Sequence, residues 1–407
     1  MHPSPNLGRR RFLLVAGVAG AGGLLAACQG AAQAPAPTAA PAPKPTTAPA
    51  AAPTAPAAAP TVAPAAAAKP VASPAAPQPV ASAAPAVAKP TTLTLPKPEM
   101  ASWTYGVYSP AYVNSVLHTV ALEKGYLKDS GFDNIEIVVG DQYIAGTVGG
   151  GMLLTFGETD PIMGASAKGE PLTYLGPYRN KEERNLGVRK GIATPADLKG
   201  TKLSGGQAAG RNEFNMKALV RKAGLNPDQD IEWIPIRGGS DATLQAIVAG
   251  QLDGGALFPR HRAALQAAGG KVLLSEQADI PQDGFFMRTD SLKKNPNLVT
   301  NYLTAIVRAR QWALKDAATT LQNKAEVLAM MEKNGFKISD DFKAAYEADM
   351  SQVSPDGGFT IASMDQLINE TKQMGNLPQD LDWRKVTDVS YLNKAQAAVG
   401  LRPNPTL

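Results

Sequence analysis

Cysteine and histidine are scarce in this sequence. Cys28 is the only cysteine among 407 residues, so the rest of the chain can form neither a disulfide nor a cysteine-based metal site. Only His118 and His261 lie beyond the N-terminal segment, and no HExxH or GxSxG motif is present. His118 falls in a predicted helix from Asn114 to Lys124, where a packed or solvated imidazole is the usual outcome. These absences disfavour metal-dependent and nucleophilic catalysis, and the stability of the fold must come from an apolar core.

Acidic residues are absent from the first 97 positions, which hold seven Lys and Arg residues. Since the net charge of the whole chain is +5, residues 98–407 carry a net charge of −2. The basic character therefore belongs to the N-terminal segment alone, and charge gives no support for nucleic-acid binding.

The N-terminus has the three-part pattern of an export signal. Three arginines, Arg9–Arg11, precede an apolar stretch from Phe12 to Ala27. This stretch is rich in Gly and Ala and shorter than the roughly 20 residues that span a bilayer, so we expect a cleaved signal peptide over residues 1–27. The arginines resemble a twin-arginine signal, whereas a third arginine and the lack of Lys after Leu14 leave the general secretory route open.

The sequence Leu25-Ala26-Ala27-Cys28 resembles the lipobox of bacterial lipoproteins, in which the cysteine carries a lipid. The alternative for Cys28 is a small buried thiol, which its position and flanks disfavour. Residues 28–97 are almost entirely Ala and Pro and cannot bury enough apolar area to fold. At about 3.1 Å per residue such a tether reaches at most about 200 Å. We therefore expect a chain anchored by lipid to the extracytoplasmic side of the cell membrane.

Residues 98–407 are long enough to form two lobes, each with its own core. Strand-like runs such as Trp103–Val107 and Ile135–Val139 alternate with helix-length segments. This alternation is typical of the α/β class with mostly parallel sheets.

Two stretches of this body share a plan. Residues 143–158 and residues 244–258 each hold a short helix that ends at glycine and passes into a buried strand. Leu153 stands in the first stretch where Asp253 stands in the second, which weakens the repeat. Two lobes of related design are the simplest account.

A helix start lies between the two repeats. Thr194 can act as the N-cap, Pro195 suits the first turn, and Asp197 is favourable near the positive helix end. Gly200 then ends the turn before a strand.

Together with Ala249–Asp253 and the lipobox, this segment resembles the periplasmic-type solute-binding proteins of ABC importers. The closest group is the NMT1/THI5-like one, which binds sulfonates, nitrate and thiamine precursors; the resemblance runs from about Trp103 to about Trp312. It implies an α/β, two-lobed type II periplasmic-binding-protein fold, with one lobe at residues 98–187 plus 284–407 and the other at 188–283. It also implies a ligand cleft that closes about a hinge, with an ABC permease and ATPase as partners. We expect a monomer.

The resemblance places the ligand at the loops that follow the strands, where helix N-termini point. The glycine-rich segment 205–210 could present backbone N–H groups to the ligand or form a plain strand-to-helix turn. The predicted ligand-binding residues are Tyr108, Ser109, Tyr112, Gln142, Tyr143, Glu158, Thr159, Asp160, Gln207, Arg211, Asn212, Phe258 and Arg260.

Four of these residues are aromatic, Tyr108, Tyr112, Tyr143 and Phe258, in a chain with only 6% Phe, Trp and Tyr. Their rings suit a flat heteroaromatic ligand, although any one of them is more often a packing residue. Riboflavin-binding lipoproteins of the same group resemble this arrangement of lipobox, Ala/Pro tether and two lobes.

Acidic residues in these loops favour an uncharged solute. Glu158 and Asp160 would repel nitrate or a sulfonate unless Arg211 or Arg260 neutralises them, but they accept well from N–H and hydroxyl groups. The alternative for Glu158 is a structural cap. We expect a neutral, planar, polyhydroxylated or amine-bearing nutrient, specifically riboflavin; a thiamine pyrimidine precursor, a sulfonate or nitrate is the alternative.

Two other classes of protein were weighed as alternatives for this sequence. Pyrimidine synthases of thiamine biosynthesis share the fold and consume their own His and a Lys-bound pyridoxal cofactor, but they need a cysteine-rich motif that is missing here. We therefore expect no enzyme activity, no cofactor and no metal. A lipid-tethered sensor or adhesin would use the same two-lobed binder without transport.

Overall fold

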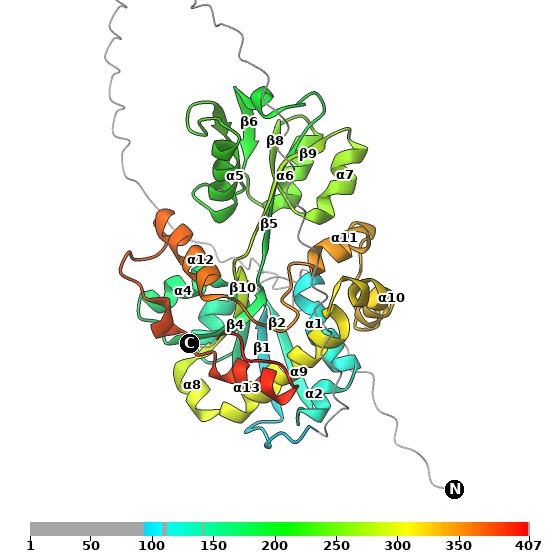
Figure 1. The fold of residues 1–407 in the computed structure, drawn as a ribbon, viewed down its shortest axis with the longest axis vertical. Helices are drawn as coiled ribbons and strands as arrows, with labels where there is room; N and C mark the ends of the chain where they lie inside the picture. Colours follow the sequence, from blue (N-terminus) through cyan, green and yellow to red (C-terminus); the bar gives the residue numbers. More distant parts are fainter. Residues whose placement is uncertain (1–92, 108–111, 141, 406–407) are drawn as a thin grey trace, which may run out of the picture. The chain divides into compact units, whose positions relative to one another are not determined.

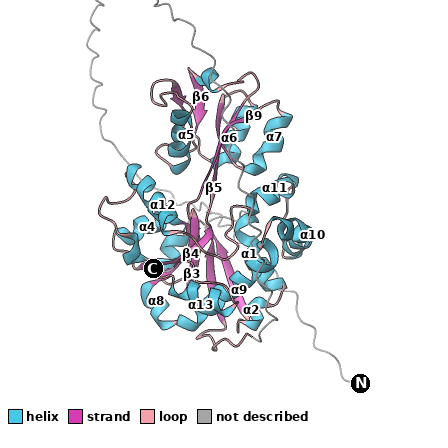
Figure 2. Cartoon of the chain, viewed as in Figure 1, coloured by secondary structure: helices cyan, strands magenta, loops and turns pink. Residues whose placement is uncertain are grey.

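A computed structural model describes residues 93–107, 112–140 and 142–405, with the side chains of 112–114 outside the description. Its strands form two five-stranded sheets, both flanked by helices (Figures 1 and 2). The predicted α/β class is confirmed. Cys28, the predicted signal peptide and the predicted tether up to residue 92 lie outside the described residues. Residues 93–97 were predicted to belong to the tether, but they are described, and the carbonyls of Pro96 and Lys97 accept from Asn301 Nδ2 at 2.8 Å and from Asn297 Nδ2 at 3.2 Å.

The first sheet has the strand order β2-β1-β3-β10-β4. Strands β1, β2 and β3 run parallel, and β10 is antiparallel to both β3 and β4. The predicted strands at 103–107 and 135–139 correspond to β1 and β2. The bounds are β1 Ser102–Val107, β2 Asn134–Val139, β3 Leu154–Glu158, β4 Leu172–Arg179 and β10 Asp283–Arg288.

The second sheet has the order β7-β6-β8-β5-β9 and repeats this plan, with one antiparallel strand, β5, between β8 and β9. Its bounds are β5 Glu182–Val188, β6 Thr201–Ser204, β7 Ile231–Trp233, β8 Gly254–Leu257 and β9 Lys271–Ala278. We call each sheet with its helices a lobe.

The chain crosses between the two sheets twice, at residues 180–181 and at residues 279–282. The predicted boundary after residue 187 therefore needs correction, whereas the one after residue 283 falls one residue inside β10. Strand β5, which the sequence assigned to the first lobe, pairs with β8 and β9 of the second. An apolar strand read from sequence does not reveal its partners, so the boundary was placed one strand too late.

The first lobe holds most of the helices. Apolar side chains of α1 and α9 pack on one face of the sheet, and those of α4 and α12 pack on the other. The bounds are α1 Tyr112–Glu123, α2 Tyr126–Asp129, α3 Tyr143–Val148, α4 Thr159–Ala167, α8 Thr289–Lys294, α9 Pro296–Leu314, α10 Ala317–Lys333, α11 Asp340–Met350, α12 Ile361–Gln373, η3 Trp383–Val386 and α13 Ser390–Ala398.

Side-chain caps define where the C-terminal helices begin. Asp316 accepts from the Thr319 N–H at the start of α10, and Ser339 accepts from the Phe342 N–H at the start of α11. Thr360 caps α12 through the Ser363 N–H. Each cap satisfies a backbone donor that the helix itself cannot, which is worth about 1 kcal/mol.

The second lobe is smaller and has two apolar clusters, one on each face of its sheet. Its helices are η1 Pro195–Leu198, α5 Arg211–Lys222, α6 Gly239–Val248, η2 Pro259–His261 and α7 Arg262–Ala267. The predicted helix start at Thr194 is confirmed as a single 3-10 turn. The capping bonds are made by Asp197, whose carboxylate accepts from the Thr194 N–H at 2.8 Å and from its hydroxyl at 3.0 Å.

The predicted repeat is present in both lobes as the units α3–β3 and α6–β8. The structure also explains the departure at Leu153 and Asp253. Leu153 packs against the first apolar core. Asp253 accepts from the Lys202 N–H at 2.7 Å and from Arg189 Nε at 2.6 Å. The two positions therefore have different structural roles: Leu153 packs against the core, and Asp253 forms hydrogen bonds at the surface.

Candidate functional site

A buried ion pair lies where the two crossings leave the first sheet. Arg179 ends β4 and Asp283 begins β10, and Arg179 Nε lies 3.1 Å from Asp283 Oδ1 and 2.9 Å from Oδ2. Both side chains are almost fully buried. Arg310 of α9 supports this end of β4, because its guanidinium donates to the carbonyls of Pro177 at 2.9 Å and Tyr178 at 3.0 Å. The hinge end of the first sheet is therefore held by charged hydrogen bonds.

Glu158 stands beside this pair, since it is the register partner of Asp283 in the ladder between β3 and β10. Glu158 remains solvent-exposed. Desolvation by the surrounding protein is the largest cause that raises its pKa to about 7, and the negative charges of Asp160 and Asp283 add to the rise. It occupies the N-cap position of α4, but its side chain makes no capping bond. A carboxyl group with a raised pKa therefore stands at the end of β3.

Thr159 anchors the loop after β3. Its fully buried hydroxyl donates to the carbonyl of Pro281 at 2.8 Å, in the second crossing segment. The side chain is thus committed to the protein and holds the start of α4 to the hinge.

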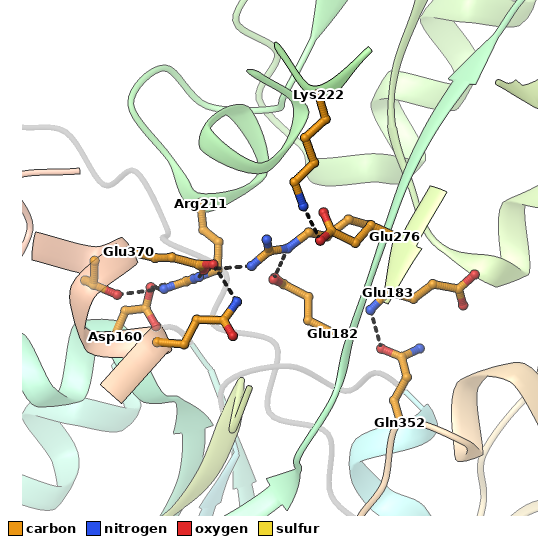
Figure 3. A network of polar contacts seen from close by, with 11 residues as sticks. Asp160, Glu182, Glu183, Arg211, Lys222, Glu276, Gln352 and Glu370 are labelled. Atoms are coloured by element: carbon orange, nitrogen blue, oxygen red, sulfur yellow. Dashed lines mark hydrogen bonds and ion pairs between the residues drawn. The ribbon is translucent and has the colours of Figure 1, made fainter. Parts of the chain in front are cut away.

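Arg211, the first residue of α5, connects the second lobe to the first (Figure 3). Its Nε donates to Asp160 Oδ2 at 2.6 Å, its Nη2 to Thr371 Oγ1 at 2.7 Å, and its Nη1 to Glu370 Oε2 at 3.2 Å. Burial works against the charged guanidinium, but the carboxylates, Asp160 first, raise the pKa of Arg211.

Glu370 also binds a second arginine from the other lobe. Arg184 Nη2 donates to Glu370 Oε2 at 2.6 Å, and Arg184 Nε donates to Glu182 Oε2 at 2.8 Å. We call Asp160, Glu182, Arg184, Arg211, Glu370 and Thr371 the interlobe network. It contains three carboxylates and two arginines, joining α4 and α12 of the first lobe to α5 and β5 of the second.

A small recess of about 10 Å³, partly open to solvent and with room for about one water molecule, lies at the end of the second sheet. It is lined by Glu182, Glu183, Arg184, Asn185, Asn212, Asn215, Met216, Ser240, Ala256, Leu257 and Phe258. Polar side chains dominate this lining and Phe258 is its one aromatic residue, so a solute here would meet hydrogen-bonding groups and a single ring face.

His261 holds the loop that carries Phe258 and Arg260. The Phe258 N–H donates to His261 Nδ1 at 3.0 Å, so the ring proton is on Nε2, which faces Asp241 Oδ1 at 2.6 Å. Burial lowers the pKa of His261 and keeps the ring neutral. Arg260 lies over the Phe258 ring, 4.8 Å from its centroid, and pairs with Asp241 at 3.6 Å.

Helix α11 of the first lobe contacts η2 of the second, and Asp349 lies near its C-terminal end. Asp349 as a residue is 6% exposed, and its carboxylate forms no hydrogen bond or ion pair with another described residue but is still reached by solvent. Burial raises its pKa to about 6, against the lowering effect of Arg260 and Arg179. Three residues on, Gln352 Oε1 accepts from the Glu183 N–H at 3.4 Å and ties this segment to β5.

Of the predicted residues, Glu158 and Asp160 lie on the first-lobe side of the interlobe region and Arg211 on the second-lobe side. Asn212 and Phe258 line the recess, and Arg260 lies over Phe258. Tyr143 lies in an apolar core, where its ring packs against Gly157, so it fills space within the first lobe. Gln142 and Gln207 are exposed. Tyr108 and Ser109 lie outside the described residues, and Tyr112 begins α1 with its side chain outside them. Only Phe258 of the four predicted aromatic residues is thus observed at the recess.

Six polar residues of this region were not predicted: Arg179, Glu182, Arg184, Asp283, Asp349 and Glu370. The charged run from Arg179 to Arg184 follows an apolar strand and could have been noticed. Asp349 and Glu370 are on C-terminal helices whose sequence shows only helical periodicity, so their approach to the second lobe had no local signal.

Of the two outcomes expected for His118, a packed or a solvated imidazole, the packed one is observed. It is 5% exposed and stacks on Tyr105, with ring centroids 5.6 Å apart. Within the part of the chain that the structure describes, no three His, Cys, Asp or Glu side chains are arranged to hold a metal ion. None of the described helices is long and apolar enough to span a bilayer.

Two α/β lobes, between which the chain passes twice, define the periplasmic-binding-protein fold. Comparison with solved structures confirms the predicted type II arrangement. The aliphatic sulphonate binding protein SsuA from Escherichia coli is similar, with 20% identity over 70% of this chain and 92% of that one, and a TM-score of 0.55. The nitrate-binding protein NrtA from Synechocystis PCC 6803 has 16% identity over 76% of this chain and 94% of that one, with a TM-score of 0.53.

The same fold also occurs in an enzyme. The desulfurization enzyme DSZB has 16% identity over 73% of this chain and 99% of that one, with a TM-score of 0.51. No curated protein sequence matches the chain. The chain belongs to the NMT1/THI5-like family, whose profile matches residues 113–320, just over half of its 407 residues.

Proposed function

We propose that this chain is the solute-binding component of an ABC importer, held to the outer face of the cell membrane through a lipid on Cys28. The observation that carries the proposal is the pairing of two lobes, joined by two crossings, with polar side chains that converge between them from both sides. Such a hinge can trap a solute and present the closed form to a permease. The family and the likeness to SsuA and NrtA, which are named as periplasmic binding proteins, support this role.

The anchor and tether suit that role. A lipid on Cys28 would hold the binder within reach of the permease and raise its effective concentration there. Replacement of Cys28 by Ser tests this part separately: we expect the variant in the soluble extracytoplasmic fraction and the native chain in the membrane fraction.

We propose riboflavin as the specific solute. It is uncharged and carries hydroxyl and imide N–H donors that match the carboxyl of Glu158, and its flat ring is of the kind that stacks on an aromatic side chain such as Phe258. A thiamine pyrimidine precursor, which is also planar and bears an amine, is the nearest alternative.

Binding without turnover is the role that we propose, although DSZB demonstrates that the fold can serve catalysis. The purified full-length chain in mild detergent should bind a solute of the panel, measured by calorimetry, and should return it chemically unchanged. Recovery of a converted product by mass spectrometry would favour the enzyme instead. A sensor role would be favoured if the chain binds the solute but cells lacking it import that solute normally.

A further inference from the structure

We propose that the recess at the end of the second sheet is a subsite for one hydroxyl group of the solute, held between Asn185 and Asn215. This inference rests on the proposed solute-binding function and specifies the chemical class of the solute, an uncharged molecule that carries an alcohol hydroxyl. It differs from what the names of the similar structures SsuA and NrtA, a sulphonate binder and a nitrate binder, would suggest.

Asn185 of β5 supplies an unused donor to the recess. The residue is 1% exposed and lines the recess, and its Nδ2 has no hydrogen-bond partner among the described residues. Its Oδ1 accepts from Ser275 Oγ at 2.8 Å and from Arg262 Nη2 at 3.4 Å. Because a guanidinium can only donate, the end of the amide that faces Arg262 must be the oxygen. The unpartnered end is therefore the NH2 group.

Asn215 of α5 supplies an unused acceptor. It is 2% exposed and lines the same recess, and its Oδ1 has no partner among the described residues. Its helix neighbours Met216 and Leu219 belong to the apolar core of the second lobe. A buried amide oxygen without a donor is costly and rare in native structures. A partner from outside the chain would satisfy both asparagines at once.

The size of the recess limits what this partner can be. About 10 Å³ has room for one water-sized group, and the two unpartnered amide atoms are hidden from bulk solvent. A single hydroxyl can accept from Asn185 Nδ2 and donate to Asn215 Oδ1. A primary amide also donates and accepts, but it is several times larger than a water molecule. The recess therefore suits a hydroxyl.

The charged residues that line the recess are already paired. Arg184 Nε donates to Glu182 Oε2 at 2.8 Å, and Arg262 binds Glu183. A charged group of a solute would thus find no free counter-charge in this lining. An ammonium group would leave Asn185 Nδ2 without an acceptor, and a sulfonate or nitrate oxygen would leave Asn215 Oδ1 without a donor. Only a neutral group that both donates and accepts satisfies the two asparagines.

The recess borders the interlobe network, in which the carboxylate of Glu182 is seen in Figure 3. Glu182 and Arg184 belong both to the network and to the lining, and Arg184 Nη2 also donates to Glu370 Oε2 of the first lobe at 2.6 Å. A solute between the lobes can therefore place one hydroxyl in the recess while the rest of the molecule lies outside it.

The experiment compares hydroxylated probes with analogues that lack the hydroxyl, using the full-length chain in mild detergent and calorimetry. The first pair is riboflavin and lumiflavin, in which a methyl group replaces the hydroxylated chain. The second pair is an aminopyrimidine with a hydroxymethyl group and the same ring with a methyl group there. A short alkanesulfonate and nitrate are the anionic probes. We expect a hydroxylated probe to bind best, and its analogue to bind about tenfold or more weakly.

The variants remove one partner of the hydroxyl at a time. Asn215→Leu removes the acceptor, and Asn185→Asp removes the donor but keeps an oxygen for Ser275 and Arg262. Each should weaken binding of the best hydroxylated probe by about tenfold and change binding of its analogue by less than about twofold.

Asn393→Leu is the matched control. Asn393 is also an asparagine within a helix, α13 of the first lobe, and its buried Oδ1 has no partner among the described residues, but it does not line the recess. Asn215→Leu and Asn393→Leu should both unfold at the native temperature or above it, because each removes an unsatisfied buried acceptor. Only Asn215→Leu should weaken binding of the hydroxylated probe.

The outcomes separate the two proposals. If no probe binds, the solute-binding function is contradicted and the inference falls with it. If an anionic probe binds best, the chain binds solutes but the hydroxyl class is wrong. If the hydroxylated probe and its analogue bind equally, or if the Asn185 and Asn215 variants bind the hydroxylated probe as the native chain does, the solute-binding function stands and the recess holds a structural water only.

Discussion

Arg211 at the start of α5 donates from Nε to Asp160 Oδ2 over 2.6 Å, and Asp160 lies in the first turn of α4 in the other lobe. A cation at the positive end of a helix is unfavourable, while an anion there is favourable. Arg211 is therefore poorly placed with respect to its own helix and depends on carboxylates of the first lobe. Arg211 therefore links the two lobes even when no solute is bound.

Loss of this tie should let the lobes move apart. In Arg211→Gln we expect a larger radius of gyration by small-angle X-ray scattering without solute, because the bonds to Asp160, Glu370 and Thr371 are removed and about 1–3 kcal/mol of interlobe attraction is lost. The control is Glu326→Gln, which breaks the exposed pair with Lys124 within the first lobe. Identical scattering of Arg211→Gln and the native chain would contradict the tie.

Asp349 should make the native chain less stable as the pH rises. Its pKa is raised from near 3.8 to about 6, so the folded state holds the proton more tightly than the unfolded state does. The protonated folded form has no penalty below pH 4, and stability is lost as the pH rises through 6. By pH 7 the loss amounts to as much as about 3 kcal/mol.

The Asp349→Asn variant tests this directly by urea unfolding at pH 4, 5, 6 and 7. Variant and native chain should have similar free energies of unfolding at pH 4, and the variant should be more stable at pH 7. A constant difference across these pH values would mean that Asp349 does not titrate in this range.

His261 and His118 should respond differently to replacement by Phe. His261→Phe leaves the Phe258 N–H without its acceptor and frees the recess loop, so we expect a cost of about 1–3 kcal/mol in stability and weaker solute binding. His118→Phe keeps the stack on Tyr105 and loses one long bond of 3.3 Å to Tyr302 Oη, so it should cost less than about 1 kcal/mol. Thermal unfolding and calorimetry measure both effects; equal losses of affinity would refute the special role of His261.

Gly205 permits the close approach of α5 to the end of β6. A Cβ there would lie 2.2 Å from Glu213 Cα and 2.5 Å from its backbone nitrogen, which a rotamer change cannot relieve. Gly205→Ala should therefore cost about 1–3 kcal/mol and displace Arg211. Gly164→Ala in α4 is the control, since the nearest atom outside the helix to its Cβ would be Asn376 O at 3.5 Å, and it should be neutral or stabilising by thermal unfolding.

Residues 205–210 illustrate what a local sequence pattern can and cannot predict. The sequence left open whether this glycine-rich segment binds a ligand or forms a turn. Gly205 is required by helix packing and Gly206 adopts a φ of +88°, so steric demands account for these two glycines. No local pattern distinguishes a glycine needed for packing from one needed for a ligand.

The sequence by itself determined the α/β class, the repeated helix–strand unit and the helix start at Thr194, because periodicity, glycine positions and caps act over a few residues. It also placed Glu158, Asp160, Arg211 and Phe258 in the segments that follow strands. Only the tertiary structure decided that β5 belongs to the second lobe, that Tyr143 is a core residue, and that Arg211 is bound by Asp160 and Glu370. Glu370 lies 159 positions from Arg211, and which charges neutralise each other over such separations depends on how the lobes pack.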